Sequence, residues 1–442
     1  MERMASSRRD PAVRAAVEQG LLSPAEPVVA LLDTAGIRAS AAALTSAFAA
    51  VTDAPVLHAF AVKAAPLVPV LRLLHAAGIG AEAASPGELA LARAAGIPPG
   101  RTVLDSPAKT PEELRGALAL GIAVNADNFQ ELARLDALAA ATTAPLPPLG
   151  LRVNPQVGAG SIDALSTATA TSKFGVALRD EGAREAVVRA FLDRPWLTRL
   201  HVHTGSQGVP LALMARGVGE AYALAEEINR AAGGRRIDTL DIGGGLPVNF
   251  ASDEETPTYA EYARLLAATV PGLFDGRYRL VTEFGRSLLA KHGTVLTRVE
   301  YTKTSGGRPI AVTHAGVQLV TRTVYAPASW PLRVLAYDSG GRPRTGETTV
   351  QDVAGPACFA GDLIATGRAL PPLRPGDVVA VPDTGAYCFA HHYAYNSLPR
   401  PAVHGFTVAG DGTVAFATVR RAQTTDEIVA ESGGDLADAL VG

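Results

Sequence analysis

Residues 57–107 read LHAFAVKAAPLVPVLRLLHAAGIGAEAASPGELALARAAGIPPGRTVLDSP, and this stretch indicates the fold of the chain. Three short apolar runs, at 57–64, 78–85 and 101–107, alternate with Ala- and Leu-rich segments. In the longer segments the apolar residues recur at three- and four-residue spacing, which predicts helices with one apolar face, whereas the short runs predict buried strands. Strands that alternate with helices in this way predict a parallel sheet.

The alternation continues to about residue 290. Five more candidate strands follow the first three, at 121–127, 149–155, 199–206, 239–245 and 278–285. Eight strand–helix units over roughly 240 residues predict a closed (β/α)8 barrel, and an open doubly wound sheet is the alternative. One helix start is clearly marked, because Thr110 can cap it, Pro111 suits its first turn and Glu113 completes a capping box.

After about residue 295 the chain becomes rich in Val and Thr, in short segments separated by Gly, Pro, Asp and Ser. This texture predicts a C-terminal antiparallel β domain, which the apolar run at 28–32 is positioned to join. We therefore expect four parts along the chain. They are a loose tail over 1–24, a joining strand and helix over 25–52, the barrel over 53–295 and the β domain over 296–442.

The overall composition excludes several classes of protein. The net charge of −3 gives no reason to expect nucleic acid or a membrane surface as a partner. The sequence has no run of about 18 apolar residues that would cross a bilayer. Its two cysteines, Cys358 and Cys388, indicate a reducing compartment without a disulfide framework. The polar start MERMASSRRD does not resemble a secretory signal, so we expect a cytoplasmic protein.

Polar residues gather where the candidate strands end, which is where (β/α)8 barrels place their chemistry. A lysine inside the run AFAVKAA is costly to bury as a cation, so it needs a partner or forms a Schiff base. Three consecutive glycines allow backbone N–H groups to wrap a phosphate, and a nearby arginine adds donors. The residues concerned are Lys63, Glu82, Ser85, Glu88, His201, His203, Ser206, Gly243, Gly244, Gly245, Glu283 and Arg286.

Each of these features has an ordinary structural explanation when taken alone. A buried lysine can sit in an ion pair, three glycines can make a tight turn, a strand histidine can be a core residue, and Glu283 can pair with Arg286. Together they supply an amine, a phosphate site, a flat ring to stack and a carboxylate. Those are the parts that hold pyridoxal phosphate, whose ring works as an electron sink when an acid stabilises its protonated nitrogen.

Eight motifs extend this pattern over about residues 25–420. They are AVKA (61–64), SPGEL (85–89), HVHTGSQ (201–207), DIGGG (241–245), EFGRS (283–287), GPAC (355–358), GAY (385–387) and YNSLPRP (395–401). In their order and spacing the chain resembles the fold type III pyridoxal-phosphate decarboxylases, the family of diaminopimelate and ornithine decarboxylases. The combination of EFGRS with GPAC, GAY and YNS resembles a decarboxylase more than an alanine racemase.

The resemblance implies a role for each matching residue. Lys63 would bind the cofactor and return a proton, His203 would stack on its ring, and Glu283 would pair with the ring nitrogen, where racemases of this fold have an arginine. Cys358 would approach the active site of the neighbouring subunit in a homodimer and is a second candidate proton donor. The phosphate would lie near Ser206, Gly243, Gly244, Gly245, Gly285 and Arg286, with Tyr387 also at the cofactor. The substrate would contact Arg286, Arg322, Tyr325, Phe359, Asp362 and Tyr387. No metal is implied.

Several positions depart from the family pattern. Phe359 stands where the family usually has an acid that binds the distal amino group of the substrate, and a phenyl ring cannot hold an ammonium. Ala65 replaces a common Asn, Glu82 replaces an Asp, and Arg322 and Tyr325 are one residue closer together than expected. The resemblance therefore predicts a decarboxylase of a divergent subgroup, with altered substrate specificity in a specialised biosynthetic pathway.

Three other functions stay open at this point. The first is racemisation or epimerisation of an amino acid with the same cofactor. The second is a non-catalytic homologue that binds pyridoxal phosphate. The third is a cofactor-free aldolase that uses Lys63 directly on a carbonyl substrate, and it leaves the glycines, the histidine and the β domain without a shared purpose.

Overall fold

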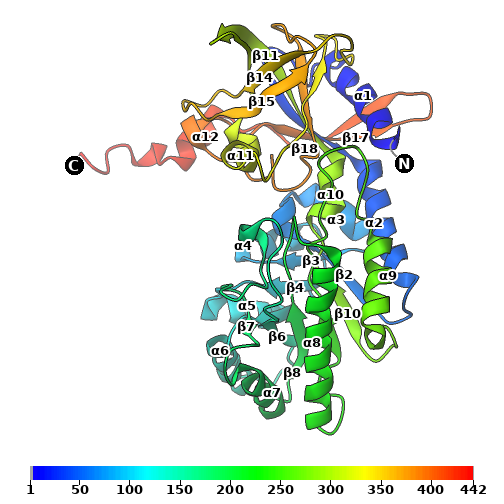
Figure 1. The fold of residues 1–442 in the computed structure, drawn as a ribbon. Helices are drawn as coiled ribbons and strands as arrows, with labels where there is room; N and C mark the ends of the chain where they lie inside the picture. Colours follow the sequence, from blue (N-terminus) through cyan, green and yellow to red (C-terminus); the bar gives the residue numbers. More distant parts are fainter. Residues whose placement is uncertain (1–2, 442) are drawn as a thin grey trace. The chain divides into compact units, whose positions relative to one another are not determined.

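The computed structural model describes residues 3–441, which form two compact units (Figure 1). The barrel unit comprises Arg38–Val248 and Thr256–Leu288. The β unit comprises the residues up to Ile37, the segment Asn249–Glu255 and the residues from Leu289 onward. The chain therefore passes between the units at 288/289, seven residues before the boundary expected at 295/296.

Eight parallel strands close into a barrel, as the alternation predicted, and the open sheet is excluded. The eight barrel strands pair in the order β2, β3, β4, β5, β6, β8, β9 and β10. The pairing of β10 with β2 closes the ring. A short ninth strand, β7 (Val176–Ala177), adds to β6. The barrel strands are β2 (Val56–Ala61), β3 (Gly80–Ala83), β4 (Thr102–Asp105), β5 (Ala123–Ala126), β6 (Leu149–Asn154), β8 (Leu197–Val202), β9 (Thr239–Asp241) and β10 (Arg279–Thr282).

Helices follow most of these strands and bury one apolar face each, as Val70, Leu71 and Leu74 do in α3. The predicted capping box at the start of α5 is present, with Thr110 and Glu113 exchanging hydrogen bonds with each other's backbone. The helices are α2 (Thr34–Ala49), α3 (Val68–Ala76), α4 (Pro86–Ala94), α5 (Pro111–Leu120), α6 (Phe129–Ala140), α7 (Ala183–Asp193), α8 (Leu211–Ala231), α9 (Tyr259–Thr269) and α10 (Arg286–Leu289).

The β unit is built on a second, mostly antiparallel sheet in the order β15-β14-β12-β11-β1-β17-β18, with β16 and β13 attached through β11. The run at 28–32 joins it as expected, as β1 between β11 and β17. Two pairs are parallel, β1–β17 and β12–β14. The strands are β1 (Val28–Asp33), β11 (Gly293–Ser305), β12 (Arg308–Thr313), β13 (Leu335–Tyr337), β14 (Thr349–Ala354), β15 (Leu363–Leu370), β16 (Val378–Pro382), β17 (Ala402–Val408) and β18 (Val414–Arg420). Its helices are α1 (Arg3–Glu18), α11 (Val317–Tyr325) and α12 (Thr425–Glu431).

The prediction of a loose tail over residues 1–24 is wrong for the part of it that the structure describes. Residues 3–18 form α1, which lies against β17 and β18 (Figure 1). Ala12, Val13 and Ala16 are fully buried in the apolar core of the β unit, together with Leu22. The buried face of α1 consists of small side chains, mainly alanine, at three- and four-residue spacing. Because these residues are only weakly hydrophobic and charged residues surround them, the helical pattern was not recognised in the sequence.

Within residues 3–441 no helix combines the length and the apolar composition that crossing a membrane requires. The longest barrel helix, α8, has 21 residues, but several of them are charged, such as Arg216 and Glu220.

The burial of α1 can be tested by substitution. Val13→Asp places a carboxylate in the apolar core of the β unit and should lower the free energy of unfolding by about 3 kcal/mol or more. Arg14→Ala, one residue along on the exposed face, removes only a weak pair with Glu18 and should change it by about 0.5 kcal/mol or less. Urea denaturation followed by circular dichroism measures both, and equal effects of the two changes would show that α1 is not packed.

Candidate functional site

Lys63 lies in a single 3-10 turn, Val62–Ala64, directly after β2. Its Nζ is 2.5 Å from Glu82 Oε2, the carboxylate that β3 supplies. The lysine side chain is 45% exposed and the glutamate side chain 1%, so the amine is accessible while its partner is enclosed. Burial raises the pKa of the Glu82 carboxyl, and the adjacent ammonium opposes that shift only in part. At one end of the barrel, an accessible lysine amine is therefore paired with a buried carboxylate.

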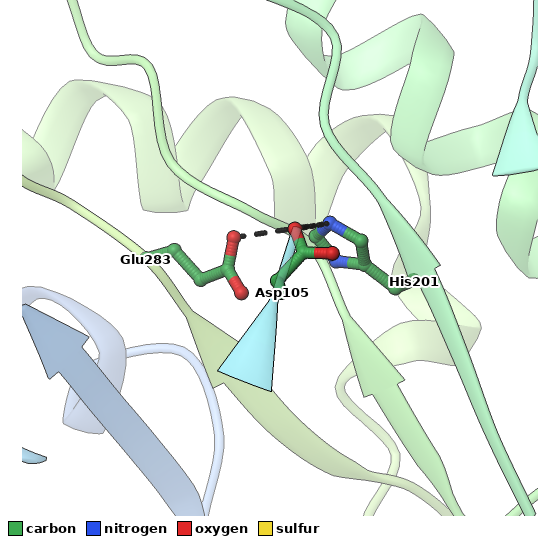
Figure 2. A group of neighbouring side chains, drawn as sticks. All are labelled: Asp105, His201 and Glu283. Carbon is green, nitrogen blue, oxygen red and sulfur yellow. Dashed lines mark ion pairs between the residues drawn. The ribbon is translucent and has the colours of Figure 1, made fainter. Parts of the chain in front are cut away.

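A buried histidine lies among three carboxylates in the interior of the barrel. Figure 2 shows it with two of them, Asp105 and Glu283. His201, on β8, has Nε2 3.1 Å from Asp105 Oδ2 and Nδ1 3.2 Å from Asp241 Oδ1. Glu283 Oε2 is 3.8 Å from His201 Nε2. Because β4 and β8 are separated in the sheet by β5 and β6, Asp105 and His201 meet across the inside of the barrel.

Two further side chains hold the aspartates of this group in place. Arg152 Nη1, from β6, lies 3.3 Å from Asp105 Oδ2. Asn125 Nδ2 donates to Asp241 Oδ2 at 3.1 Å, and the Gly243 N–H donates to Asp241 Oδ1 at 3.2 Å. Glu283 Oε1 and Asp105 Oδ1 are both buried and have no hydrogen-bond partner among the described residues, whereas both oxygens of Asp241 accept hydrogen bonds.

The pKa values of this group follow from burial and charge together. Burial alone would lower the pKa of His201, but Glu283, Asp241 and Asp105 raise it well above its usual value. Burial and the neighbouring Asp241 raise the pKa of Glu283 well above its usual value, against the opposing effect of His201. For Asp105 burial is outweighed by His201 and Arg152, so its pKa falls well below the usual value.

His203 follows β8 and is kept neutral by its surroundings. Burial, then Arg152 and Lys63, lower the pKa of its imidazole well below the usual value. Its Nδ1 accepts a hydrogen bond from the Gly244 N–H at 3.1 Å, so the ring proton of the neutral form lies on Nε2. This bond ties the histidine ring to the glycine loop.

The glycine loop 243–245 packs so closely that no side chain fits on it. A Cβ on Gly243 would lie 2.7 Å from His203 Nδ1, and one on Gly244 would collide with the Glu283 carbonyl oxygen. Gly245 adopts φ 95° and faces the Gly205 carbonyl, next to Ser206. Reciprocal hydrogen bonds between Gln207 and Val248 hold the two loops together. Close packing therefore requires glycine at all three positions.

These residues fit pyridoxal phosphate. The accessible amine of Lys63, the ring of His203 and the backbone of the glycine loop lie at the strand ends of the same barrel unit. The unpaired Glu283 Oε1 offers an acceptor for one proton on a ring nitrogen. Arg286, which is buried, begins α10 immediately after Gly285.

In the β unit the structure brings together the other residues singled out from the sequence. The Arg322 guanidinium lies 4.8 Å from the ring centre of Tyr387 and 5.2 Å from that of Trp330. Tyr325 stacks on Phe359, with ring centres 5.7 Å apart. Tyr393 and Tyr395 complete this aromatic group, and the segment also carries the exposed Cys358.

The carboxylate of Asp362, a residue that we expected to contact the substrate, accepts hydrogen bonds from two backbone amides in this structure. Its Oδ1 accepts from the Val317 N–H and its Oδ2 from the Ala357 N–H, both at 2.7 Å. The side chain is buried, and a Cβ on Gly316 or Gly355 would collide with it. Asp362 thus fixes the GPAC segment on which Cys358 and Phe359 stand.

Sequence reasoning assigned no role to Asp105, Arg152 and Asp241. Asp105 and Asp241 each end a barrel strand, so the same strand-end rule that selected Lys63 would have found them. Arg152 is a charged residue inside the apolar run LGLRVNP, the kind of signal that drew attention to Lys63.

Comparison with known proteins places the barrel and its surroundings in a family. Residues 35–290 match the model of the pyridoxal-dependent decarboxylases, pyridoxal binding domain. The diaminopimelate decarboxylase of Pseudomonas fluorescens is 34% identical over 85% of this chain and 86% of that protein. That of Actinosynnema pretiosum is 33% identical over 90% and 86%. The crystal structure of diaminopimelate decarboxylase from Helicobacter pylori complexed with L-lysine has a TM-score of 0.81 at 25% identity, covering 95% of this chain and all of that chain.

Replacing one glycine of the loop tests how closely it packs. Gly244→Ala places a methyl group against the Glu283 carbonyl and should lower the free energy of unfolding by about 1–3 kcal/mol, with a local shift of the loop. Gly116→Ala, inside α5 with no atom near its Cβ, should leave stability unchanged or raise it by about 0.5–1 kcal/mol. Thermal unfolding of both variants is the measurement, and a Gly244→Ala protein as stable as wild type would contradict the packing described.

Proposed function

Since this chain belongs to the family of pyridoxal-dependent decarboxylases, we propose that Lys63 is its cofactor-binding lysine. We also propose that the enzyme decarboxylates an amino acid and that its substrate specificity is its own. Family membership makes the protein a carboxy-lyase that uses pyridoxal phosphate. The observation that supports Lys63 most directly is its accessible amine, paired with Glu82 at the end of the barrel that also holds Glu283 and the glycine loop.

When bound, pyridoxal phosphate supplies a sink for the electrons that remain on the α-carbon as CO2 leaves. The residues of this chain would hold and orient it. Lys63 Nζ would bind its aldehyde carbon, His203 would lie against its ring, and Glu283 would accept a hydrogen bond from its ring nitrogen. Ser206, the loop 243–245 and Arg286 would surround the phosphate with N–H donors and one positive charge.

Glu82 and Lys63 form a pair that can pass a proton. Burial raises the pKa of Glu82 and the ammonium of Lys63 opposes that shift, so the two groups compete for one proton when no cofactor is attached. The short Nζ–Oε2 distance keeps that proton in a defined direction. Lys63 is thereby placed to return a proton to a substrate carbon, with Cys358 as the second candidate donor.

Replacing the lysine tests this assignment. Lys63→Ala should abolish the visible absorbance that pyridoxal phosphate gives when it is attached to a protein, and should lower the rate of CO2 release by about 10³-fold or more. Lys303→Ala, a change at an exposed lysine of β11, should leave both unchanged. A Lys63→Ala protein that decarboxylates its substrate near the wild-type rate would contradict the assignment.

For the substrate we propose an amino acid whose distal group is less basic, or differently shaped, than that of ornithine or lysine. Phe359 lies in an aromatic group with Tyr325, Tyr393 and Tyr395, and such rings offer stacking surface and hydroxyl groups. The nearby Asp362 gives both oxygens to backbone amides. Diaminopimelate, the substrate named for the curated relatives, is the main competing choice.

Changing residue 359 tests the substrate class. Phe359→Asp should raise kcat/KM for L-lysine or diaminopimelate relative to the best natural substrate by about tenfold or more, since it adds an anion for the distal ammonium. Phe359→Leu keeps an apolar side chain and should not change that ratio. Strong turnover of L-ornithine or L-lysine by the wild type, undiminished in Phe359→Ala, would contradict the proposal.

We also propose a homodimer in which Cys358 of each subunit approaches the active site of its partner. Cys358 is exposed, and its backbone N–H is fixed by Asn396 Oδ1 at 2.7 Å, so the thiol stands on an ordered segment. Neither cysteine forms a disulfide among residues 3–441, which suits a protein that works in the reducing cytoplasm.

A further inference from the structure

Inside the barrel unit, the surroundings of His201 favour a charged imidazole. Both ring nitrogens face carboxylate oxygens, at 3.1 Å and 3.2 Å, and the ring has no exposed surface. A neutral imidazole carries one N–H and one bare nitrogen, and the bare nitrogen would then face an anion with no proton between them. An imidazolium removes this conflict. Neither ring nitrogen makes a hydrogen bond of good geometry, so Asp105 and Asp241 favour the imidazolium through their charge at short distance.

The charges around His201 lead to the same conclusion. Four carboxylates occupy the inside of the barrel and its end, namely Glu82, Asp105, Asp241 and Glu283. The permanent cations facing them are three, Lys63, Arg152 and Arg199, and Arg199 is buried on the same face of β8 as His201. Lys109 and Glu131, behind Asp105, pair with each other at 2.9 Å, and Asp127 accepts the Gly175 N–H. A protonated His201 adds a fourth cation to this acidic group.

Glu283 gains most from this cation. At 3.8 Å its Oε2 is too far from His201 Nε2 for a good hydrogen bond, so the interaction is one of charge, and Oε1 stays unengaged. Asp241 and Asp105 repel a charge on Glu283, and His201 attracts it. Without the cation, Glu283 would take up a proton more readily and lose its ability to accept one from a ring nitrogen.

We propose that His201 is a positioning residue, an imidazolium held between Asp105 and Asp241 that favours the ionised form of Glu283 at the place where it meets the cofactor. The inference rests on the proposed function, in which Glu283 faces the ring nitrogen. His201 itself touches neither cofactor nor substrate and acts through Glu283. Asp105 has the complementary role of holding the charge on His201, together with Arg152, which fixes the Asp105 side chain.

The first measurement uses the protein without cofactor. In nitrogen-15 NMR of histidine-labelled protein, the two ring nitrogens of His201, identified from the His201→Gln spectrum, should both remain protonated from pH 6 to pH 8.5. A neutral imidazole signal from His201 within this range would overturn the proposal. This result is independent of catalysis, so it stands even if the protein proves to bind no pyridoxal phosphate, an outcome that would count against the proposed function instead.

The second measurement uses the protein loaded with pyridoxal phosphate. His201→Gln should lower kcat by about 10- to 100-fold, as loss of a supporting residue commonly does, with little change in KM. It should also move the acid limb of the pH–kcat profile to higher pH, because removing the cation raises the pKa of Glu283 and protonates it earlier as pH falls. His58→Gln, at a buried histidine of β2 that contacts Thr282 and no carboxylate, should not move that limb.

A double variant separates this role from a purely structural one. Asp105→Asn combined with His201→Gln removes one charge of each sign, so it should be more stable than His201→Gln alone. It also removes a repulsive charge from the neighbourhood of Glu283, so the acid limb should return toward its wild-type position. If His201→Gln lowers activity without moving the acid limb, or if the double variant shows no return, His201 has only a structural role.

Discussion

Charge buried inside a closed barrel is the constraint on which the rest of this structure depends. A carboxylate removed from water is strongly unfavourable unless a cation or hydrogen-bond donors compensate it. Here Asp105, Asp241 and Glu283 come from three different strand ends, and one imidazolium on β8 reaches all of them. The barrel must close with its registers intact for those contacts to form. The same closure brings Lys63 onto Glu82 and the glycine loop onto His203.

This arrangement separates the groups that react from the groups that set their charge. Lys63 is nearly half exposed and has an enclosed acid beside it, which suits an amine that must be reached by ligands. His203 is neutral, so its ring can lie against a flat cofactor without adding a positive charge there. Asp105, Asp241 and His201 are buried inside the barrel, and there the charges of neighbouring groups shift the pKa of each.

The barrel could be predicted from the sequence because short apolar strands and longer helices with apolar residues at three- and four-residue spacing look different. Each of the eight strand–helix units repeats that difference. Lys63, His203, Glu283 and the glycines could be proposed as site residues because chemistry in such a barrel gathers at strand ends. The pairing of Asp105 with His201 could not be found in this way, since the two lie 96 positions apart and meet only across the closed interior. The helix α1 was missed because its buried face consists mainly of alanine, and Asp362 was assigned to the substrate although backbone amides occupy both of its oxygens.

The central claim is that this chain uses pyridoxal phosphate on Lys63 to release CO2 from one amino acid. The most direct test records the visible absorbance of the purified protein with added pyridoxal phosphate while a panel of amino acids is supplied and released CO2 is trapped. The account predicts a yellow protein whose absorbance band shifts with one amino acid as CO2 appears. A band that shifts without CO2 would indicate racemisation instead, and a protein that stays colourless with added pyridoxal phosphate would contradict the account.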